Sequence, residues 1–438
     1  MTDDVRTLDP PPGVLEIAQQ LRRAGYETWC VGGAVRDALL GHANSDWDLA
    51  TAATPAEMRR VFRRIVPVGE EHGTLGILDH DGVMHEVTTF RRDVETDGRH
   101  ARVVFSSSID EDLARRDFTI NAIASSPFSG ELRDPFGGRD DLARRVIRAV
   151  GEPAERMRED RLRALRAIRF AARFEFDIEP ATWQAIVDSA PFLTRLSAER
   201  VREELTKTMV QTARPARAME RWLESGAFAA VVPVLASVPP ENRAATSCVR
   251  APSDTAHAAR RDARLLTRLS VLFAGLAYRD AERTLRALKF SNAEVRWTAG
   301  MADLWREHAG ALAAVARHPD VVVLRRIAAA VDRTRLAPLL RVAAALWAAR
   351  RAAGHDAPTE MEVRALYRRA VRTAYRDAIA LGDLAVDGDD LRRSGIPAGR
   401  ALGTILHRLL GLVVEDPSLN TRDVLLAHAR EIAAELAH

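Results

Sequence analysis

Hydrophobic and polar positions follow two different patterns along the chain. Up to about residue 150, short apolar runs that suit strands alternate with stretches of helical spacing. Beyond that point the spacing is helical almost throughout. The pattern therefore predicts an α/β head followed by a long all-α region.

Several elements of the head can be bounded from the sequence. A helix is expected over 14–23, and another from Pro55 to about Phe62, because Thr54 and Glu57 have the spacing of a helix N-terminal cap. Strands are expected over 28–31, 46–50, 76–78 and 84–90, with a turn at 80–82. Loops rich in Pro, Ser or Gly are expected near 238–255 and over 354–358, and both are candidate boundaries.

Composition limits the class of protein. The 438 residues are 47% hydrophobic and 29% charged, which is typical of a globular chain with more than one domain. The two cysteines, Cys30 and Cys248, cannot form a disulfide framework. The N-terminus is acidic and no apolar run is long enough to span a bilayer, so we expect a cytoplasmic protein without membrane contact. The net charge of +3 permits an anionic partner.

The run from residue 32 to residue 48 carries the first candidate chemistry. Gly32 and Gly33 allow a backbone to approach a polyphosphate closely, and Arg36 follows them on an expected helix. Asp46 and Asp48 lie two residues apart on an expected strand, so both side chains point to the same face, as two Mg²⁺ ligands must. Together these residues suggest metal-assisted nucleotidyl transfer.

Glu86 is the candidate for a third carboxylate. It lies in the run His85-Glu86-Val87, and neighbouring apolar residues suggest a buried strand, in which a glutamate needs a partner. A nearby metal ion would supply one. The alternative is a glutamate on an edge strand that faces solvent.

The run 115–122 contains a second group of polar residues. Arg116 could hold a triphosphate, and Asp117 and Asn121 could contact ribose hydroxyls, which would select ribonucleotides. The alternative is a helix that carries surface charges.

The run 159–170 contains a third group, with Asp160, Arg163, Arg166 and Arg169 three residues apart on one expected helix face. A carboxylate accepts hydrogen bonds and a guanidinium donates them, so Asp160 and Arg163 could read the edge of a base while the later arginines hold phosphate. The alternative is a core helix with a solvated basic side.

With these three runs in order, the chain resembles the class II tRNA nucleotidyltransferase and poly(A) polymerase family over roughly residues 25–205. The run 197–205 and weaker matches at 395–400 and 419–422 extend the resemblance. It implies a polymerase-β-like sheet with helices in the head, followed by an all-α neck, body and tail. The implied domains are a catalytic head (1–150), a neck that recognises the base (151–215), a body (216–370) and a tRNA-binding tail (371–438).

The resemblance also implies an activity and roles for residues. The activity is template-independent addition of CCA to tRNA 3′ ends, from CTP and ATP, by two-metal nucleotidyl transfer. Asp46 and Asp48 would bind Mg²⁺ and Glu86 would complete the catalytic carboxylates. Gly33 and Arg36 would contact the incoming nucleotide and Arg116 its triphosphate. Asp160 and Arg163 would select the base, supported by Arg166 and Arg169.

Related activities share the same motifs. CC-only or A-only addition and poly(A) synthesis remain alternatives, and a non-catalytic RNA-binding scaffold is an alternative of another class. In the family, the loop at 93–105 is tied to the switch from C to A addition, and its presence here favours full CCA addition. The sequence carries no signal for an oligomeric state.

Overall fold

The computed structural model describes residues 8–42, 46–96, 101–249, 257–397 and 399–436. The chain divides into two compact units, residues 1–212 with 218–233, and residues 213–217 with 234–438. Within the described residues, none of the helices is both long enough and apolar enough to cross a membrane.

The first unit is built on a seven-stranded sheet of order β3-β4-β5-β2-β1-β8-β9. Its strands are β1 (Thr28–Val31), β2 (Asp48–Thr51), β3 (Ile65–Gly69), β4 (Thr74–Leu78), β5 (Met84–Thr89), β8 (Ala124–Ser125) and β9 (Leu132–Arg133). One face is apolar and packs into the core, with Leu49, Leu75 and Val87 fully buried on it. Since side chains alternate along a strand, Asp48 and Glu86 point to the opposite face.

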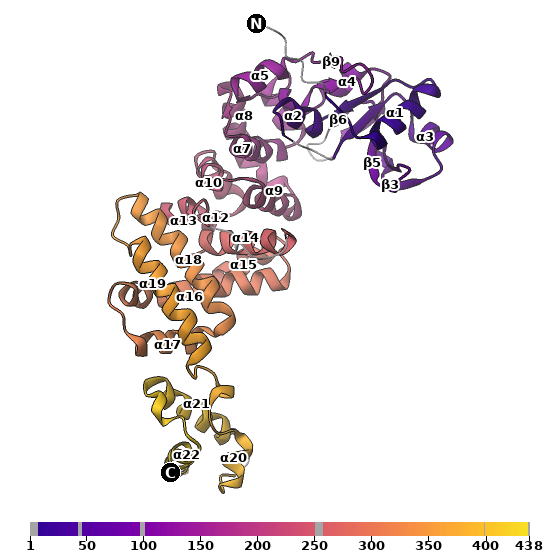
Figure 1. The fold of residues 1–438 in the computed structure, drawn as a ribbon. Helices are drawn as coiled ribbons and strands as arrows, with labels where there is room; N and C mark the ends of the chain where they lie inside the picture. The colour runs from indigo at the N-terminus through magenta and orange to yellow at the C-terminus, as the bar shows by residue number, and fades with distance from the viewer. Residues whose placement is uncertain (1–7, 43–45, 97–100, 250–256, 398, 437–438) are drawn as a thin grey trace. The chain divides into compact units, whose positions relative to one another are not determined.

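Helices surround this sheet and continue from it. They are α1 (Pro12–Arg23), α2 (Gly33–Leu39), α3 (Pro55–Val61), α4 (Ile109–Ala114), α5 (Gly138–Arg144), α6 (Pro153–Glu159), α7 (Leu162–Phe174), α8 (Pro180–Ser189), α9 (Ala198–Gln211), α10 (Pro215–Glu224) and α11 (Ala227–Val231), with short 3₁₀ turns η1 (Glu70–His72), η2 (Thr119–Asn121) and η3 (Ala190–Arg195). Figure 1 shows α7 and α9 near one another to one side of the sheet, and the two helices pack together. This packing positions the polar face of α7 described below.

Most expectations for the head are confirmed, including the strands at 76–78 and 84–90, and two are wrong. The first strand, the helix over 14–23 and the Thr54–Glu57 capping box all form as expected. Strand β2 begins only at Asp48, so Asp46 precedes it rather than lying within it. The expected loop at 93–105 is instead a hairpin of β6 (Arg91–Thr96) and β7 (Ala101–Phe105), while residues 97–100 of that expectation lie outside the described residues.

Beyond residue 150 the described chain is helical as expected, apart from the short strand β11 (Asp177–Ile178), which pairs with β10 (Val146–Ile147) from the end of the head. The second unit contains α12 (Pro233–Ala236, whose first residue belongs to the first unit), α13 (Pro240–Ala245), α14 (His257–Leu272), α15 (Tyr278–Ala287), α16 (Asn292–Arg317), α17 (Val321–Val331), α18 (Arg333–Ala352), α19 (Glu360–Arg376), η4 (Leu381–Asp383), α20 (Gly388–Arg393), α21 (Arg400–Glu415), η5 (Pro417–Leu419) and α22 (Arg422–Leu436). The loop at 354–358 is confirmed between α18 and α19. The prediction of a loop near 238–255 is wrong over 240–245, which form α13. Residues 250–255 of that prediction lie outside the described part of the chain.

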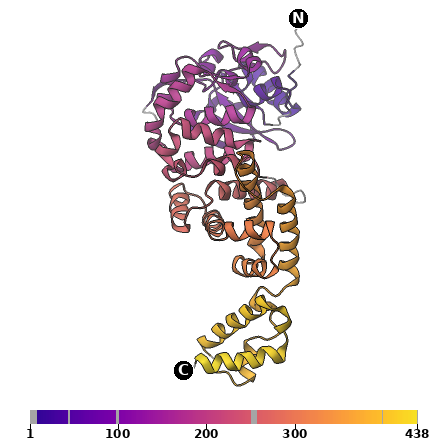
Figure 2. The ribbon, with the colours of Figure 1, turned by 90° about the vertical axis from the view of Figure 1, so that its left-hand side faces the viewer.

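The second unit has more than one hydrophobic core. One core joins α16–α19 through buried residues such as Leu339 and Trp347. A separate core joins α20, α21 and α22 around Leu409 and Leu425. Figure 2 shows α21 and α22 (yellow) packed side by side. The last helices therefore have an apolar core of their own.

Candidate active site

A glycine turn brings backbone close to Asp48. Gly32 joins β1 to α2 with φ of 75°, a conformation that favours glycine. A Cβ on Gly32 would lie 3.1 Å from Arg116 Nη1 and 3.8 Å from Asp48 Oδ2. The turn thus leaves an open space beside a guanidinium and a carboxylate, and a larger residue would fill it.

Asp48 sits among other negative charges. Burial raises the pKa of Asp48 to about 6, and the charges of Asp46 and Glu86 add to the rise, although Arg116 opposes it. Asp48 lies directly across from Glu86 on the sheet, because Leu49 pairs with Val87 in parallel register. This crowding favours either a bound proton or a bound cation at Asp48.

The two other predicted carboxylates are exposed. Asp46 precedes β2, and Glu86 faces solvent on β5, so the expectation that Glu86 is buried is wrong. In the parts of the chain that the structure describes, no three Asp, Glu, His or Cys residues are close enough to hold a metal ion together. Carboxylate oxygens are donors that suit a hard divalent cation, and Asp46 and Asp48 remain the candidate pair.

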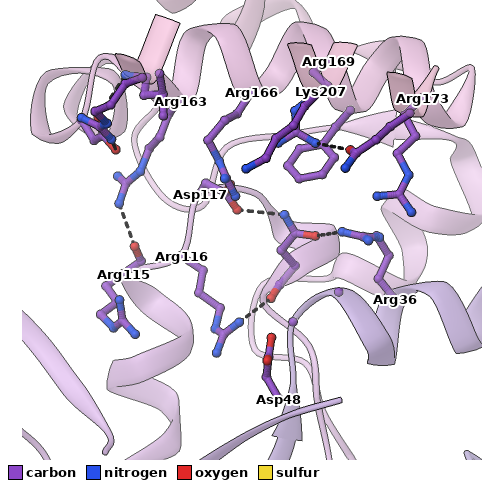
Figure 3. A pocket seen from close by; sticks show the side chains of 18 residues that line it. Arg36, Asp48, Arg115, Arg116, Asp117, Arg163, Arg166, Arg169, Arg173 and Lys207 are labelled. Carbon is purple, nitrogen blue, oxygen red and sulfur yellow. Dashed lines mark hydrogen bonds and ion pairs between the residues drawn. The ribbon is translucent and has the colours of Figure 1, made fainter. Parts of the chain in front are cut away.

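Asp48 lies at the edge of a cavity of about 510 Å³ (Figure 3). Its lining side chains include nine Arg or Lys and three Asp residues, which makes it strongly cationic. The lining residues are Gly32, Gly33, Arg36, Asp48, Arg115, Arg116, Asp117, Asn121, Asp160, Leu162, Arg163, Arg166, Arg169, Phe170, Arg173, Arg200, Lys207 and Gln211. Such a concentration of guanidinium groups suits a polyphosphate.

Figure 3 shows Arg163 and Arg166 of α7 extending toward the side of the cavity where Arg115, Asp117 and Asp48 lie. Arg169, by contrast, pairs with Glu204. Arg163, Arg166 and Arg169 follow one another along this helix, as the spacing predicts. Asp160 does not belong to the helix, because α6 ends at Glu159 and α7 begins at Leu162. The expectation of one helical face shared by Asp160 and Arg163 is therefore wrong, although both residues line the cavity.

Hydrogen bonds connect the residues expected to contact the sugar and the phosphates. Asp117 accepts from Asn121 Nδ2 at 2.9 Å and from Arg166 Nε at 2.9 Å, and the Asn121 side chain in turn accepts from Arg36. Burial is the largest single influence and opposes ionisation of Asp117, but the charge of Arg166 and the hydrogen bonds from Asn121 and Arg166 together keep the pKa of Asp117 below its usual value. Asp117 is thus an ionised carboxylate that is already partnered by protein groups.

Arg36, which the sequence suggests as a phosphate ligand, lines the cavity and is engaged by protein groups. Its side chain is buried, and both Nε and Nη2 donate to Asp37. Burial lowers the pKa of Arg36, while Asp37 opposes that shift. The ring of Phe174 lies 4.6 Å from its guanidinium carbon. Arg36 is held rigidly at the cavity wall.

The base-reading candidates also have protein partners. Asp160 forms an ion pair with Arg200 at 2.8 Å, and Arg163 contacts Glu159 at 2.6 Å and the carbonyl of Arg115 at 2.9 Å. Arg169 is buried and pairs with Glu204 at 2.7 Å. It therefore does not belong to a solvated basic face of a core helix, which was the alternative interpretation of this run.

Sequence reasoning missed several residues that line the cavity. Arg173 lies four residues after Arg169 and has the helical spacing that could have found it. Arg200 and Lys207 come from α9, in or just after the run 197–205, to which no role was assigned. Arg115 is the neighbour of Arg116 in sequence, and only the fold shows that it also lines the cavity.

Comparison with known proteins gives consistent results. Residues 28–148 match the poly A polymerase head domain, and residues 175–238 match the family described as a probable RNA and SrmB-binding site of polymerase A. A CCA-adding enzyme of Geobacillus kaustophilus is 36% identical over 95% of this chain and 96% of its own length. One from Geobacillus stearothermophilus is 47% identical over 44% of this chain, and that match spans about half the length of the relative (48%).

A solved structure resembles the whole chain. The crystal structure of the Bacillus stearothermophilus CCA-adding enzyme in complex with CTP is 32% identical, with a TM-score of 0.70. The likeness covers 97% of this chain and 98% of that one. The polymerase-β-like sheet with a helical continuation is therefore the observed fold of both.

Proposed function

The chain belongs to the CCA-adding enzymes, which are nucleotidyltransferases, and we propose that it adds C, C and A in order to the 3′ end of tRNA from CTP and ATP. The observation that carries the proposal is the half-buried Asp48, placed between a glycine turn and a cavity rich in arginine. A triphosphate needs cations, and a transfer centre needs carboxylates beside it.

Members of this family use divalent metal ions, and we propose Mg²⁺ here, held by Asp46 and Asp48. When bound, the metal would activate the RNA 3′-hydroxyl and neutralise charge on the departing pyrophosphate. Arg116 donates to the triphosphate, because it lies beside the glycine turn. Glu86 stands across from Asp48 and orients the attacking end of the RNA or accepts its proton.

The polar network gives the remaining residues their proposed roles. Asp117 and Asn121 hold Arg166 and Arg36 in place, and they would exchange part of this network for contacts to the ribose hydroxyls. Asp160 and Arg163 exchange some of their present partners for the edge of cytosine or adenine. Arg166 and Arg169 fix the position of α7 and the charge of the pocket.

We further propose the division of labour among the head (1–150), neck (151–215), body (216–370) and tail (371–438). The catalytic and base-reading residues lie in the first two, and the tail reaches the distant part of tRNA. Because its substrate is tRNA, the enzyme would act in the cytoplasm.

End-product sequencing tests the function. A tRNA transcript that lacks CCA is incubated with Mg²⁺ and with CTP, ATP or both. Addition of two C residues with CTP, followed by one A and a stop when ATP is present, supports the proposal. CC alone, A alone or a long A tract would reassign the activity within the family. No incorporation on any RNA would support the scaffold hypothesis instead.

A further inference from the structure

A small uncharged surface lies on the open face of the sheet, next to the catalytic acids. Glu86 pairs with Gly76 and Gly76 with Val66, and the register of β2 with β5 continued by one residue places Asp48 beside Glu86. These four residues therefore form one row from β2 to the edge strand β3. Side chains in one row point to the same face of a sheet. The row therefore leads from the reaction centre to apolar residues at the edge.

Two residues of this row, Val66 and Gly76, adjoin Val68 and Met84, which lie on the same face. We call these four residues, Val66, Val68, Gly76 and Met84, the β3–β5 platform. A Cβ on Gly76 would lie 2.7 Å from Met84 Sδ and 3.0 Å from Val68 Cγ2, so both side chains close over the glycine. Val66, Val68 and Met84 are 37%, 42% and 44% exposed. Exposed apolar groups gathered in this way indicate a contact surface.

The position of the platform relative to the cavity suggests what it contacts. The cavity cations approach Asp48 from the side of β1, through the glycine turn, Arg116 and α7. The described lining residues include none from β3, β4 or β5. In an in-line displacement the attacking and leaving oxygens lie on opposite sides of the phosphorus. If the pyrophosphate leaves toward the cations, the RNA 3′-hydroxyl arrives from the side of Glu86.

We propose that the β3–β5 platform binds the 3′-terminal nucleotides of the RNA, with base and ribose packed on Val66, Val68 and Met84. This inference rests on the proposed function and extends it to the second substrate. Adjacent strands are about 4.8 Å apart, so Gly76 lies about 10 Å from Asp48 and Val66 about 14 Å. The apolar faces of bases lose contact with water when they pack there, and no cation is needed, because these contacts are not to phosphate.

Three uncharged substitutions test the platform. Val66→Thr and Val68→Thr keep the branched shape that suits a strand, and Met84→Gln keeps the length of the side chain. The triple variant thus removes apolar character without adding charge beside Asp48. Val83→Thr is the matched control, because Val83 is 54% exposed in the turn before β5 and does not belong to the row.

The measurements are steady-state KM values for a tRNA transcript that lacks CCA and for CTP, together with the melting temperature. We expect the triple variant to raise the RNA KM about tenfold, while kcat and the CTP KM stay within about twofold of wild type. Val83→Thr should change none of these values. A general structural defect would instead lower the melting temperature and alter the CTP KM as well.

Three outcomes would overturn the inference. An RNA KM in the triple variant equal to that of Val83→Thr, with normal wild-type incorporation, refutes the platform and leaves the proposed function standing. A wild-type dimer that the triple variant dissociates, seen by light scattering, assigns the surface to a second copy of the chain. A wild type that incorporates no nucleotide refutes the proposed function and the platform with it.

Discussion

Asp48 combines burial with negative neighbours, and this combination has measurable consequences. The pKa of Asp48 is raised to about 6 by burial first and by Asp46 and Glu86 next. Such a group is costly as an anion unless a cation binds it. A metal ion at this position would turn an unfavourable charge into a favourable contact.

Replacing Asp48 by Asn should abolish transfer without unfolding the protein. The side chain keeps its shape but loses the charge that a metal ion requires, and its strand neighbour Leu49 stays buried. We expect incorporation of labelled CTP to fall at least about a thousandfold, with no loss of melting temperature. Asp46→Asn should act in the same way. Turnover like that of wild type in either variant would contradict the assignment.

The raised pKa of Asp48 also makes a prediction about stability in metal-free protein. Because the pKa is higher in the folded than in the unfolded state, the folded state binds more protons between pH 3.8 and 6. The free energy of unfolding of wild type, relative to Asp48→Asn, should therefore fall as pH rises through that window, by at most about 3 kcal/mol. Urea unfolding of both proteins in EDTA measures this difference. A difference that is flat or rises with pH would show that Asp48 titrates normally.

Asp160 makes a prediction about specificity. Its carboxylate accepts hydrogen bonds from Arg200 and from the backbone N–H of Leu162 at the N-terminus of α7. If it also reads the base, Asp160→Ala should let UTP and GTP compete with CTP and ATP, by about 1–3 kcal/mol or roughly ten- to a hundredfold in relative kcat/KM. Competition assays with all four nucleotides measure this ratio. Slower transfer with unchanged discrimination would limit Asp160 to a structural role.

At the scale of elements, the packing of α7 against α9 includes a buried ion pair. Arg169 and Glu204 are each almost fully buried and lie 2.7 Å apart. Removing one partner leaves the other charge buried without compensation. Glu204→Gln should therefore lower the free energy of unfolding by about 3 kcal/mol, measured with urea.

A neighbouring pair provides the control for that prediction. Glu203 and Lys207 lie on the same helix, at 2.6 Å, but are much more exposed. Glu203→Gln should cost less than about 1 kcal/mol, because exposed ion pairs contribute little. If the two substitutions destabilise equally, burial is not what gives the α7–α9 pair its importance.

How far the sequence predicts the elements depends on whether the signal is local. The Thr54–Glu57 capping box is a local pattern of four residues, and it forms as predicted. Strand β3 was missed because it is an exposed edge strand with Pro67 in its middle, so no alternation of burial marks it. The break at Asp160 was missed because the residues around it all favour helix.

The candidate site shows the same limit. The sequence identifies the glycine turn, Asp48 and the α7 arginines because each of these features follows from the spacing of residues close together in the chain. The partners of Arg36 could not be read in this way, since Asn121 is 85 residues away in sequence. Spacing identifies which side chains share a face, whereas which of them neutralise one another is set by tertiary packing.

At the scale of the molecule, the nucleotide cavity and the last helices belong to different parts of the chain. All residues that line the cavity lie within the first unit. The helices α20–α22 have their own apolar core in the second unit. Binding of CTP should thus be independent of the tail, whereas binding of a whole tRNA should not.

A stop after Asp383 tests this separation. The truncated protein lacks α20–α22 but keeps η4, whose last residue, Asp383, forms an ion pair with Arg333. We expect the KM for tRNA to rise about tenfold, because contacts to the distant part of the tRNA are lost, while the KM for CTP stays within about twofold. A minihelix that contains only the acceptor stem is the matched substrate, and both proteins should use it equally well. Equal losses on tRNA and minihelix would mean that the truncation damages the first unit rather than removing a tRNA contact.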